Sequence, residues 1–415
     1  MSSSIYDKNR MLYDYSQSES VKVVPTDLQQ IPFDDQSYDE GQTMTITFST
    51  GDYFLDPEKS YIQVGVGIVG NGVNPLSVNF GRGSCANLFG GCRIYHKSGT
   101  QITHNVNLDL WTKAKQKIEK DGFWFNSQGL IQGYLADPTG AGQSWWVSTT
   151  TQPEVRIFKI KLADLHPFFR GTERKIFPPQ IADGLRIELD LNTSGRVFFI
   201  NPIVAPSSPI VSWNVSSCSL QAALVDVQDQ AADITNDVAI SRGLQWEFND
   251  VFITTITVNQ NESDINIPVE KAVRKAQNVI TFFRDSTGDT LPNFDSHVYP
   301  PQPDARWNYR IGNILYPYKR AVNNPIDSYT ACIDSFEWQY GTNLTFNDFD
   351  TYDSLYTTLL RTEDQLLASG DFLNANKRVE LQFQKSPAQE SLLGHSCLEY
   401  RRVLSVNGVN SKVED

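Results

Sequence analysis

The chain has 415 residues, of which 12% are aromatic and 20% charged, and its formal net charge at pH 7 is −13. This length predicts two domains, and the aromatic content favours β-sheets. The acidic balance, without any Lys/Arg-rich run, argues against a basic arm that grips nucleic acid and against docking on anionic membranes. No stretch approaches 18 apolar residues, so no membrane span is expected.

The five cysteines are odd in number and form no CxxC pair, which argues against a disulfide framework and fits folding in a reducing compartment. Residues 1–20 are polar, so no signal peptide is expected. Glycosylation would matter only in a secreted protein, at four sequons: Asn192, Asn214, Asn261 and Asn343.

Residues 1–40 are rich in Ser, Asp, Gln and Tyr without clear periodicity, which predicts an extended N-terminal arm. Period-two alternation of apolar residues then indicates a first series of strands. They are expected around 44–48, 61–68, 94–95, 155–162, 185–191 and 219–227.

A second series of the same style follows a polar segment, Gln228 to Gly243. Its strands are expected around 244–248, 251–258, 265–267, 278–283, 379–383 and 403–406. We therefore predict a first domain at residues 41–230, a linker at 231–243 and a second domain at 244–415.

Two segments have helical periodicity. Leu108 to Lys120 lies between a plausible N-cap, Asn107, and a plausible C-terminal glycine, Gly122. Asp350 to Leu367 places an apolar stripe on one face, and Gly370 follows it.

Each predicted helix follows a copy of one phrase, Gly-Thr-x-x-Thr-x-Asn, at residues 99–105 and again at 341–347. Chance alone can match seven residues. The shared context of a strand before the phrase and a helix after it favours duplication of one domain plan.

Motifs for catalysis or cofactors have simpler interpretations. Gly65 to Gly70 matches GxGxxG, but the glycines lie within a strand and no helix follows, so a strand is expected. Asp226, Asp229, Asp233 and Asp237 lack the glycine and terminal glutamate of a calcium loop, which predicts a solvated connection.

The five histidines show no metal spacing, and His104 is expected to be a half-buried packing residue. The tryptophans Trp145 and Trp146 could stack on a sugar, but a loop anchored on its own domain is the simpler interpretation. Carboxylate pairs suited to a glycosidase exist by composition only, at Asp34-Asp35, Asp39-Glu40, and Asp348 with Asp350. We predict no catalytic, cofactor-binding or metal-ligating residue and no cofactor.

Tandem β-domains without a catalytic motif resemble the double jelly-roll major capsid proteins of polinton-like viruses, virophages and related dsDNA viruses. The likeness spans about residues 42 to 415 as a pattern, and the chain is short for this group. Three stretches carry it: Tyr61–Val64 with Val78–Phe80 and Asn87–Tyr95, Leu165–Phe169 through Phe177–Pro179 to Leu185–Leu189, and Tyr400–Gly408.

The resemblance implies an all-β fold of two tandem jelly rolls, with a short helix in each and long loops. It also implies a non-enzymatic protein that assembles as homotrimeric, pseudo-hexagonal capsomers of an icosahedral shell, alongside penton and minor capsid proteins. Two alternatives stay open: a carbohydrate-active β-sandwich enzyme or lectin, and a minor capsid or spike protein.

Overall fold

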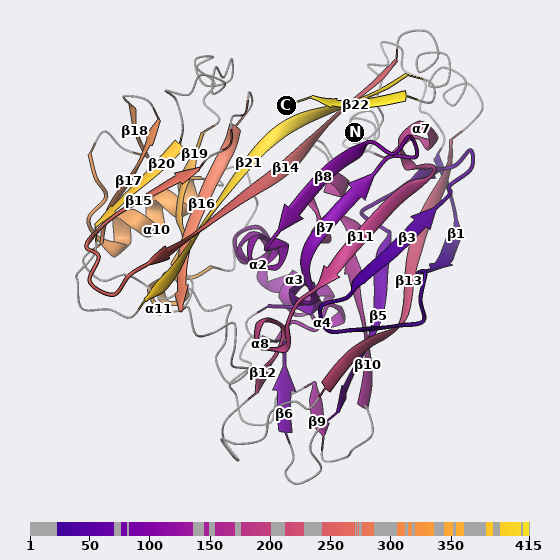
Figure 1. Ribbon diagram of the computed structural model, residues 1–415, viewed down its shortest axis with the longest axis horizontal. Coiled ribbons are helices and arrows are strands. Elements are labelled where there is room, and N and C mark those ends of the chain that lie inside the picture. The colour runs from indigo at the N-terminus through magenta and orange to yellow at the C-terminus, as the bar shows by residue number, and fades with distance from the viewer. Residues whose placement is uncertain are drawn as a thin grey trace.

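The chain folds into two β-sandwich domains that lie side by side (Figure 1). The computed structural model describes residues 23–69, 76–80, 83–135, 145–148, 154–170, 176–200, 212–227, 243–269, 271, 273, 276–285, 305–311, 314–317, 320–335, 344–351, 354–360, 379–384, 391–407 and 410–414. Within these residues, no helix is long and apolar enough to cross a membrane.

Two sheets, each with four principal strands, form the sandwich of the first domain. One has the order β1-β13-β5-β10, and the other has the order β3-β11-β7-β8. Their bounds are β1 (Val23–Pro32), β3 (Thr43–Phe48), β5 (Tyr61–Val69), β7 (Phe89–Tyr95), β8 (Gln101–Val106), β10 (Glu154–Lys161), β11 (Leu185–Leu191) and β13 (Ser212–Val227).

The short strands of this domain extend or flank these sheets. Two of them pair with β13, and a separate small sheet has the order β12-β6-β9. Their bounds are β2 (Ser37–Asp39), β4 (Phe54–Leu55), β6 (Leu76–Asn79), β9 (Trp146–Ser148) and β12 (Phe199–Ile200).

The second domain has the sheets β14-β21-β16-β19 and β15-β20-β17-β18, with β22 paired to β21. The bounds are β14 (Leu244–Val258), β15 (Asp264–Val269), β16 (Ala276–Asp285), β17 (Arg306–Ile311), β18 (Ile314–Tyr316), β19 (Tyr356–Leu359), β20 (Val379–Gln384), β21 (Leu392–Asn407) and β22 (Asn410–Glu414).

The two domains have the same topology. When the eight principal strands of each domain are numbered along the chain, both domains form the sheets 1-8-3-6 and 2-7-4-5. This is the two-sheet arrangement of a jelly roll. The predicted fold class, all-β with two tandem jelly rolls, is confirmed. The predicted boundaries at 41–230 and 244–415 stay a prediction, because residues 228–242 lie outside the described residues.

Part of the predicted N-terminal arm belongs to the first sheet instead. Residues 1–22 lie outside the described residues, but β1 and β2 pair antiparallel with β13. Leu28 and Gln30 of β1 both point away from the core, although one is apolar and the other polar. Apolar residues therefore do not alternate along this edge strand, and the sequence pattern did not predict it.

In the described part of the chain, helices are short and connect strands. The longest of these is α2 (Leu108–Glu119), which the sequence predicted, followed by α10 (Pro325–Asp334) and α11 (Phe346–Thr351). The remaining helical turns are η1 (Cys85–Leu88), α3 (Gly122–Phe125), α4 (Gln128–Ile131), α5 (Leu162–Leu165), α6 (Pro167–Arg170), α7 (Pro179–Ala182) and α8 (Ser194–Val197).

The helix predicted from Asp350 to Leu367 is wrong. Tyr356–Leu359 is strand β19, and residues 361–378 lie outside the described residues. Tyr356 packs into the interior of the second sandwich, whereas Leu355 packs on the side facing the first domain. A strand buried on both faces has no polar alternation, so its apolar residues also fit a helical stripe.

The repeated phrase does not mark equivalent positions. Its first copy ends in β8, the fifth principal strand, and α2 follows directly. The second copy lies after α10; residues 341–343 are outside the described residues, and the phrase continues into α11. The counterpart of α2 is α10, which follows the fifth strand β18. The two domains therefore share one plan, but the repeated phrase matches by chance.

The longest strands link the domains. Along β14 and β21, pairing is continuous from Leu244–Val406 to Val258–Leu392. The part of β21 beyond Tyr400 no longer pairs with β16, and its Leu404 and Val406 join the core of the first domain. The two strands run diagonally from the second domain onto the first (Figure 1).

Candidate functional site: the junction between the two domains

Helix α2 lies between the domains and is buried on every side, from Leu108 to Ile118. Its Trp111 and Lys115 are one helical turn apart and therefore share a face. Trp111 Nε1 donates to Glu399 Oε1 on β21 at 2.7 Å, and Lys115 Nζ lies 3.1 Å from the same oxygen. The first domain's helix is thus tied to the outer face of the second domain's sheet.

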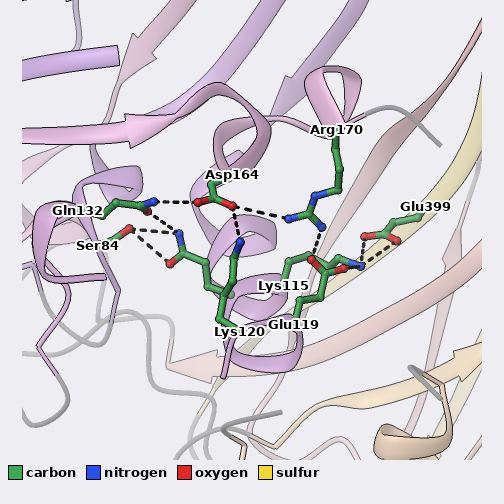
Figure 2. Close-up of polar contacts among 9 residues, drawn as sticks. Ser84, Lys115, Glu119, Lys120, Gln132, Asp164, Arg170 and Glu399 are labelled. Carbon is green, nitrogen blue, oxygen red and sulfur yellow. Dashed lines mark hydrogen bonds and ion pairs between the residues drawn. The ribbon is translucent and has the colours of Figure 1, made fainter. Parts of the chain in front are cut away.

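A polar network extends this contact into the first domain (Figure 2). Lys115 also pairs with Glu119 at 2.6 Å, and Glu119 accepts a hydrogen bond from Arg170 of α6. Asp164 of α5 lies 3.9 Å from the Arg170 guanidinium. The network therefore joins α2, α5, α6 and β21.

Asp164 has two further contacts at the far end of the network (Figure 2). It lies 2.5 Å from Lys120 Nζ and accepts a hydrogen bond from Gln132 Nε2 at 2.8 Å. Gln116 Nε2 then donates to Gln132 Oε1 at 3.2 Å. These contacts fix α2 to α5 and to the C-terminal end of α4.

Charge within the network is balanced by three cations and three carboxylates: Lys115, Lys120, Arg170, Glu119, Asp164 and Glu399. Burial opposes the charge on Lys115, but Glu119 and Glu399 outweigh it and raise its pKa. Burial likewise opposes the Asp164 carboxylate, but Lys120 and Arg170 outweigh it and lower its pKa. Every charge stays paired, which a buried ionic cluster requires.

A second polar cluster lies where β14 and β21 leave the second domain. Asp250 faces Tyr400 across these strands and is buried. Its Oδ1 accepts from Thr103 Oγ1 at 2.7 Å and from Asn105 Nδ2 at 3.0 Å, both on β8. Its Oδ2 lies 3.1 Å from Arg402 Nη1. One carboxylate of the second domain therefore holds the edge strand of the first.

His166 supports this cluster from the first domain. The Phe168 N–H donates to His166 Nδ1 at 3.0 Å, so that nitrogen carries no proton. His166 Nε2 lies 2.5 Å from Asn105 Oδ1 and donates to it. The imidazole is neutral, and burial lowers its pKa to about 4. Asn105 is thereby oriented with its amide group toward Asp250.

No protein-family model and no curated protein matches this sequence. Solved structures match its fold over nearly the whole chain. The Faustovirus major capsid protein aligns with a TM-score of 0.64 at 10% identity, covering 95% of this chain and 92% of that one. The mavirus major capsid protein aligns with a TM-score of 0.57 at 9% identity, covering 97% and 92%.

A chain of the Sputnik virophage aligns with a TM-score of 0.60 at 12% identity, covering 97% of this chain and 91% of that one. This chain has the double jelly-roll fold of viral major capsid proteins. The resemblance drawn from the sequence is therefore confirmed for the fold.

Several motifs that could have indicated a cofactor or sugar site are structural parts of the first jelly roll. Gly65 and Gly67 lie within β5, paired on both sides by β10 and β13, as expected for a strand. Trp146 is fully buried, and Trp145 Nε1 donates to the Gly133 carbonyl at 2.7 Å, so both side chains are anchored on their own domain as expected, although Trp146 begins strand β9. Both tryptophan rings contact Phe158.

Two of the carboxylate pairs lie at strand ends and turns, and the third lies in helix α11. Asp34 and Asp35 are exposed between β1 and β2. Glu40 accepts hydrogen bonds from Ser194 N and Trp213 Nε1, which is a structural role. Asp348 accepts from Thr345 Oγ1 at the start of α11, in the second jelly roll. Of the acidic run, Asp226 is in β13 and the others lie outside the described residues.

The described histidines and cysteines do not form a metal or catalytic site. His104 is exposed, so the half-buried position predicted for it is wrong. His395 is buried, and Arg284 Nε donates to its Nε2 at 2.7 Å. All five cysteines are buried and free. In the described part of the chain, no group of three or more His, Cys, Asp or Glu side chains could hold a metal ion.

The residues of the junction could not be found from the sequence. Lys115 and Glu399 are 284 positions apart, and no local pattern relates them. The one usable sign was composition: Lys113, Lys115 and Lys117 fall at spacings that place them around a helix, yet all three are buried. A charged helix without a solvent face indicates a partner surface on more than one side.

Proposed function

We propose that this protein is the major capsid protein of a dsDNA virus. It acts without catalysis: three chains associate into a trimer, and the trimers are the pseudo-hexagonal capsomers of an icosahedral shell. The observation that carries this proposal is the full-length double jelly-roll fold, with one strand order used twice. Three copies of such a chain supply six similar domains, which is the number that a hexagonal outline needs.

The junction supports this role. Two jelly rolls joined by a flexible tether could not hold six domains in one fixed outline. Here a shared core and two buried polar clusters fix one domain on the other. The same chain can therefore act as one rigid building block of the virion.

The charge fits the proposal as well. A net charge of −13 does not suit a shell that condenses its genome through a basic arm, but it suits a shell that is filled after assembly. The proposed partners are other copies of the chain, a penton protein and minor capsid proteins, with no sequence-specific nucleic-acid binding. Synthesis in the cytoplasm or nucleus of a host cell precedes assembly.

Light scattering after size-exclusion chromatography tests the proposal. We expect a species of three times 46.8 kDa, and hexagonal particles by negative-stain electron microscopy. A monomer at all concentrations and salt conditions contradicts it. Hydrolysis of a polysaccharide that is lost on changing one carboxylate would instead favour the glycosidase alternative.

A further inference from the structure

The junction within the chain shows how one jelly roll docks on the next. The second domain contributes the outer face of its sheet β14-β21-β16-β19, which carries Glu399. The first domain contributes its fifth strand, β8, and the helix that follows it, α2. One domain thus offers a sheet face, and the other offers a strand and helix.

The same two surfaces recur at the outer ends of the molecule, where no other domain covers them in the described part of the chain. The first domain has the equivalent sheet, β1-β13-β5-β10, and the second has the equivalent helix, α10. In Figure 1, β1 and β13 lie at one end of the molecule, whereas β17 and β18 lie at the other. These two surfaces therefore belong to opposite sides of the chain and cannot meet within it.

The free sheet carries apolar side chains that are exposed. Val155 and Ile157 of β10 point outward, opposite the inward-facing Phe158, and are 47% and 61% exposed. Leu28 of β1, on the same outer face, is 54% exposed. In the corresponding sheet of the second domain, Ile280 and Cys397 on the outer face are buried by the junction.

The free helix has a matching apolar patch. Ser328, Ala331 and Cys332 of α10 are buried against its own domain, but Ile326 is 66% exposed. Tyr329, one turn further, contacts Phe346, which is 40% exposed. The equivalent helix α2 has no such free face, because the second domain's sheet covers it.

Charges on the two free surfaces are complementary. Lys159 and Lys161 continue the outward face of β10 beyond Ile157. Asp334 at the end of α10 and Asp350 of α11 are exposed. In the junction within the chain the polarity is the reverse, because the helix provides Lys115 and the sheet provides Glu399. This reversed polarity favours pairing of the two free surfaces with each other over pairing of either one with a surface of the internal junction.

We propose that the outer face of β1-β13-β5-β10 docks on α10 and α11 of a second copy of this chain, centred on Ile157 and Ile326. The contact repeats the internal junction between molecules. It is heterologous, since two different surfaces meet, and a heterologous contact that closes gives a ring. With two domains per chain, closure after three chains alternates first and second domains around the ring. The inference rests on the proposed function and assigns its interface.

Single charge insertions test the interface. Ile157→Glu and Ile326→Glu each place a carboxylate in the proposed contact, and both side chains are exposed, so the fold should remain intact. We expect each variant to be a monomer in light scattering, with an unchanged circular dichroism spectrum at low temperature and a Tm that does not depend on protein concentration. Phe123→Glu is the control, because Phe123 is 81% exposed on α3, outside both surfaces. It should remain a trimer.

Mixing the two monomeric variants tests the head-to-tail arrangement. Ile157→Glu keeps an intact helix surface, and Ile326→Glu keeps an intact sheet surface. Each mixed pair can form one contact and no more, so a 1:1 dimer is expected. A trimer of either variant alone overturns the assignment of that surface. No association in the mixture overturns the pairing of the two.

Crosslinking provides a measurement that does not depend on destabilising the contact. A chain with Ile157→Cys and Ile326→Cys should give covalent trimers with a short bis-maleimide, while either single variant should stay uncrosslinked; the five native cysteines are buried. If the unmodified chain is a trimer but the double variant does not crosslink, the interface is wrong and the proposed function stands. A native chain that is always monomeric overturns both.

Discussion

The two jelly rolls share one strand order but differ in what covers them. In the first domain the helix after the fifth strand is buried on all sides, and the sheet β1-β13-β5-β10 has a free outer face. In the second domain, helix α10 has a free face. Strand β16 of that domain is buried on both faces from Asn278 to Arg284. The two domains have the same topology, so the difference in burial comes from where each domain lies relative to its neighbour.

Neighbouring phenylalanines on β16 offer the largest test of this difference. Phe282 packs into the core shared with the first domain, and Phe283 into the interior of the second, and both are fully buried. Either change to Ala should lower the free energy of unfolding by about 3–5 kcal/mol, because each leaves a cavity.

Hydrogen exchange separates the two. Phe282→Ala should raise exchange in α2 as well as β16, whereas Phe283→Ala should raise it in β17 and β20 and leave α2 protected. The same exchange pattern in both variants would show that the domains do not differ in this way.

The junction charge offers a smaller test. Glu399→Gln keeps the shape of the side chain but leaves three cations facing two carboxylates in the buried network. We expect a loss of about 1.5–3 kcal/mol in the free energy of unfolding by urea, as for a buried hydrogen bond to a charged group.

Glu414→Gln is the matched control for that change. Its partner Lys412 is 74% exposed, and the exposed pair should contribute less than about 1 kcal/mol. Equal losses in the two variants would mean that the junction network does not hold the domains together.

The smallest test is pH dependence. Burial lowers the pKa of His166 to about 4, whereas an unfolded histidine titrates near about 6.5. Between these values the unfolded state binds more protons, so the free energy of unfolding falls as pH falls from about 6.5 to about 4.

His166→Gln can still donate to Asn105 but cannot titrate. It should flatten this slope by up to about 1.4 kcal/mol per pH unit, measured by urea unfolding at a series of pH values. A residual slope is expected, because burial lowers the pKa of His96 and His395 too. An unchanged slope would place the titrating groups elsewhere.

Much of the fold could be predicted from alternation alone. Leu185–Leu191, with apolar side chains facing in and charged side chains facing out, is strand β11 as expected. Alternation failed where both faces of a strand are buried, as at β19, and where the apolar residues of an edge strand do not alternate, as at β1.

Helix α10 was missed although its start carries a local signal. Asn324 Oδ1 accepts from the Asp327 backbone N–H, and Pro325 occupies the first helical position. The helix has only ten residues, and Ile326 is exposed while Ala331 and Cys332 are buried, so its apolar residues do not form one buried stripe. The junction itself could not be predicted, because its partners, such as Lys115 and Glu399, lie far apart in the sequence.

The long strands β14 and β21 have a consequence for synthesis. Leu404, Val406 and the half-buried Val413 pack into the core of the first domain, although most of the second domain separates them in sequence from β13. Domains commonly fold in order as they leave the ribosome. Here the first domain cannot complete its core until β21 and β22 have been made, so both jelly rolls should reach their final packing together.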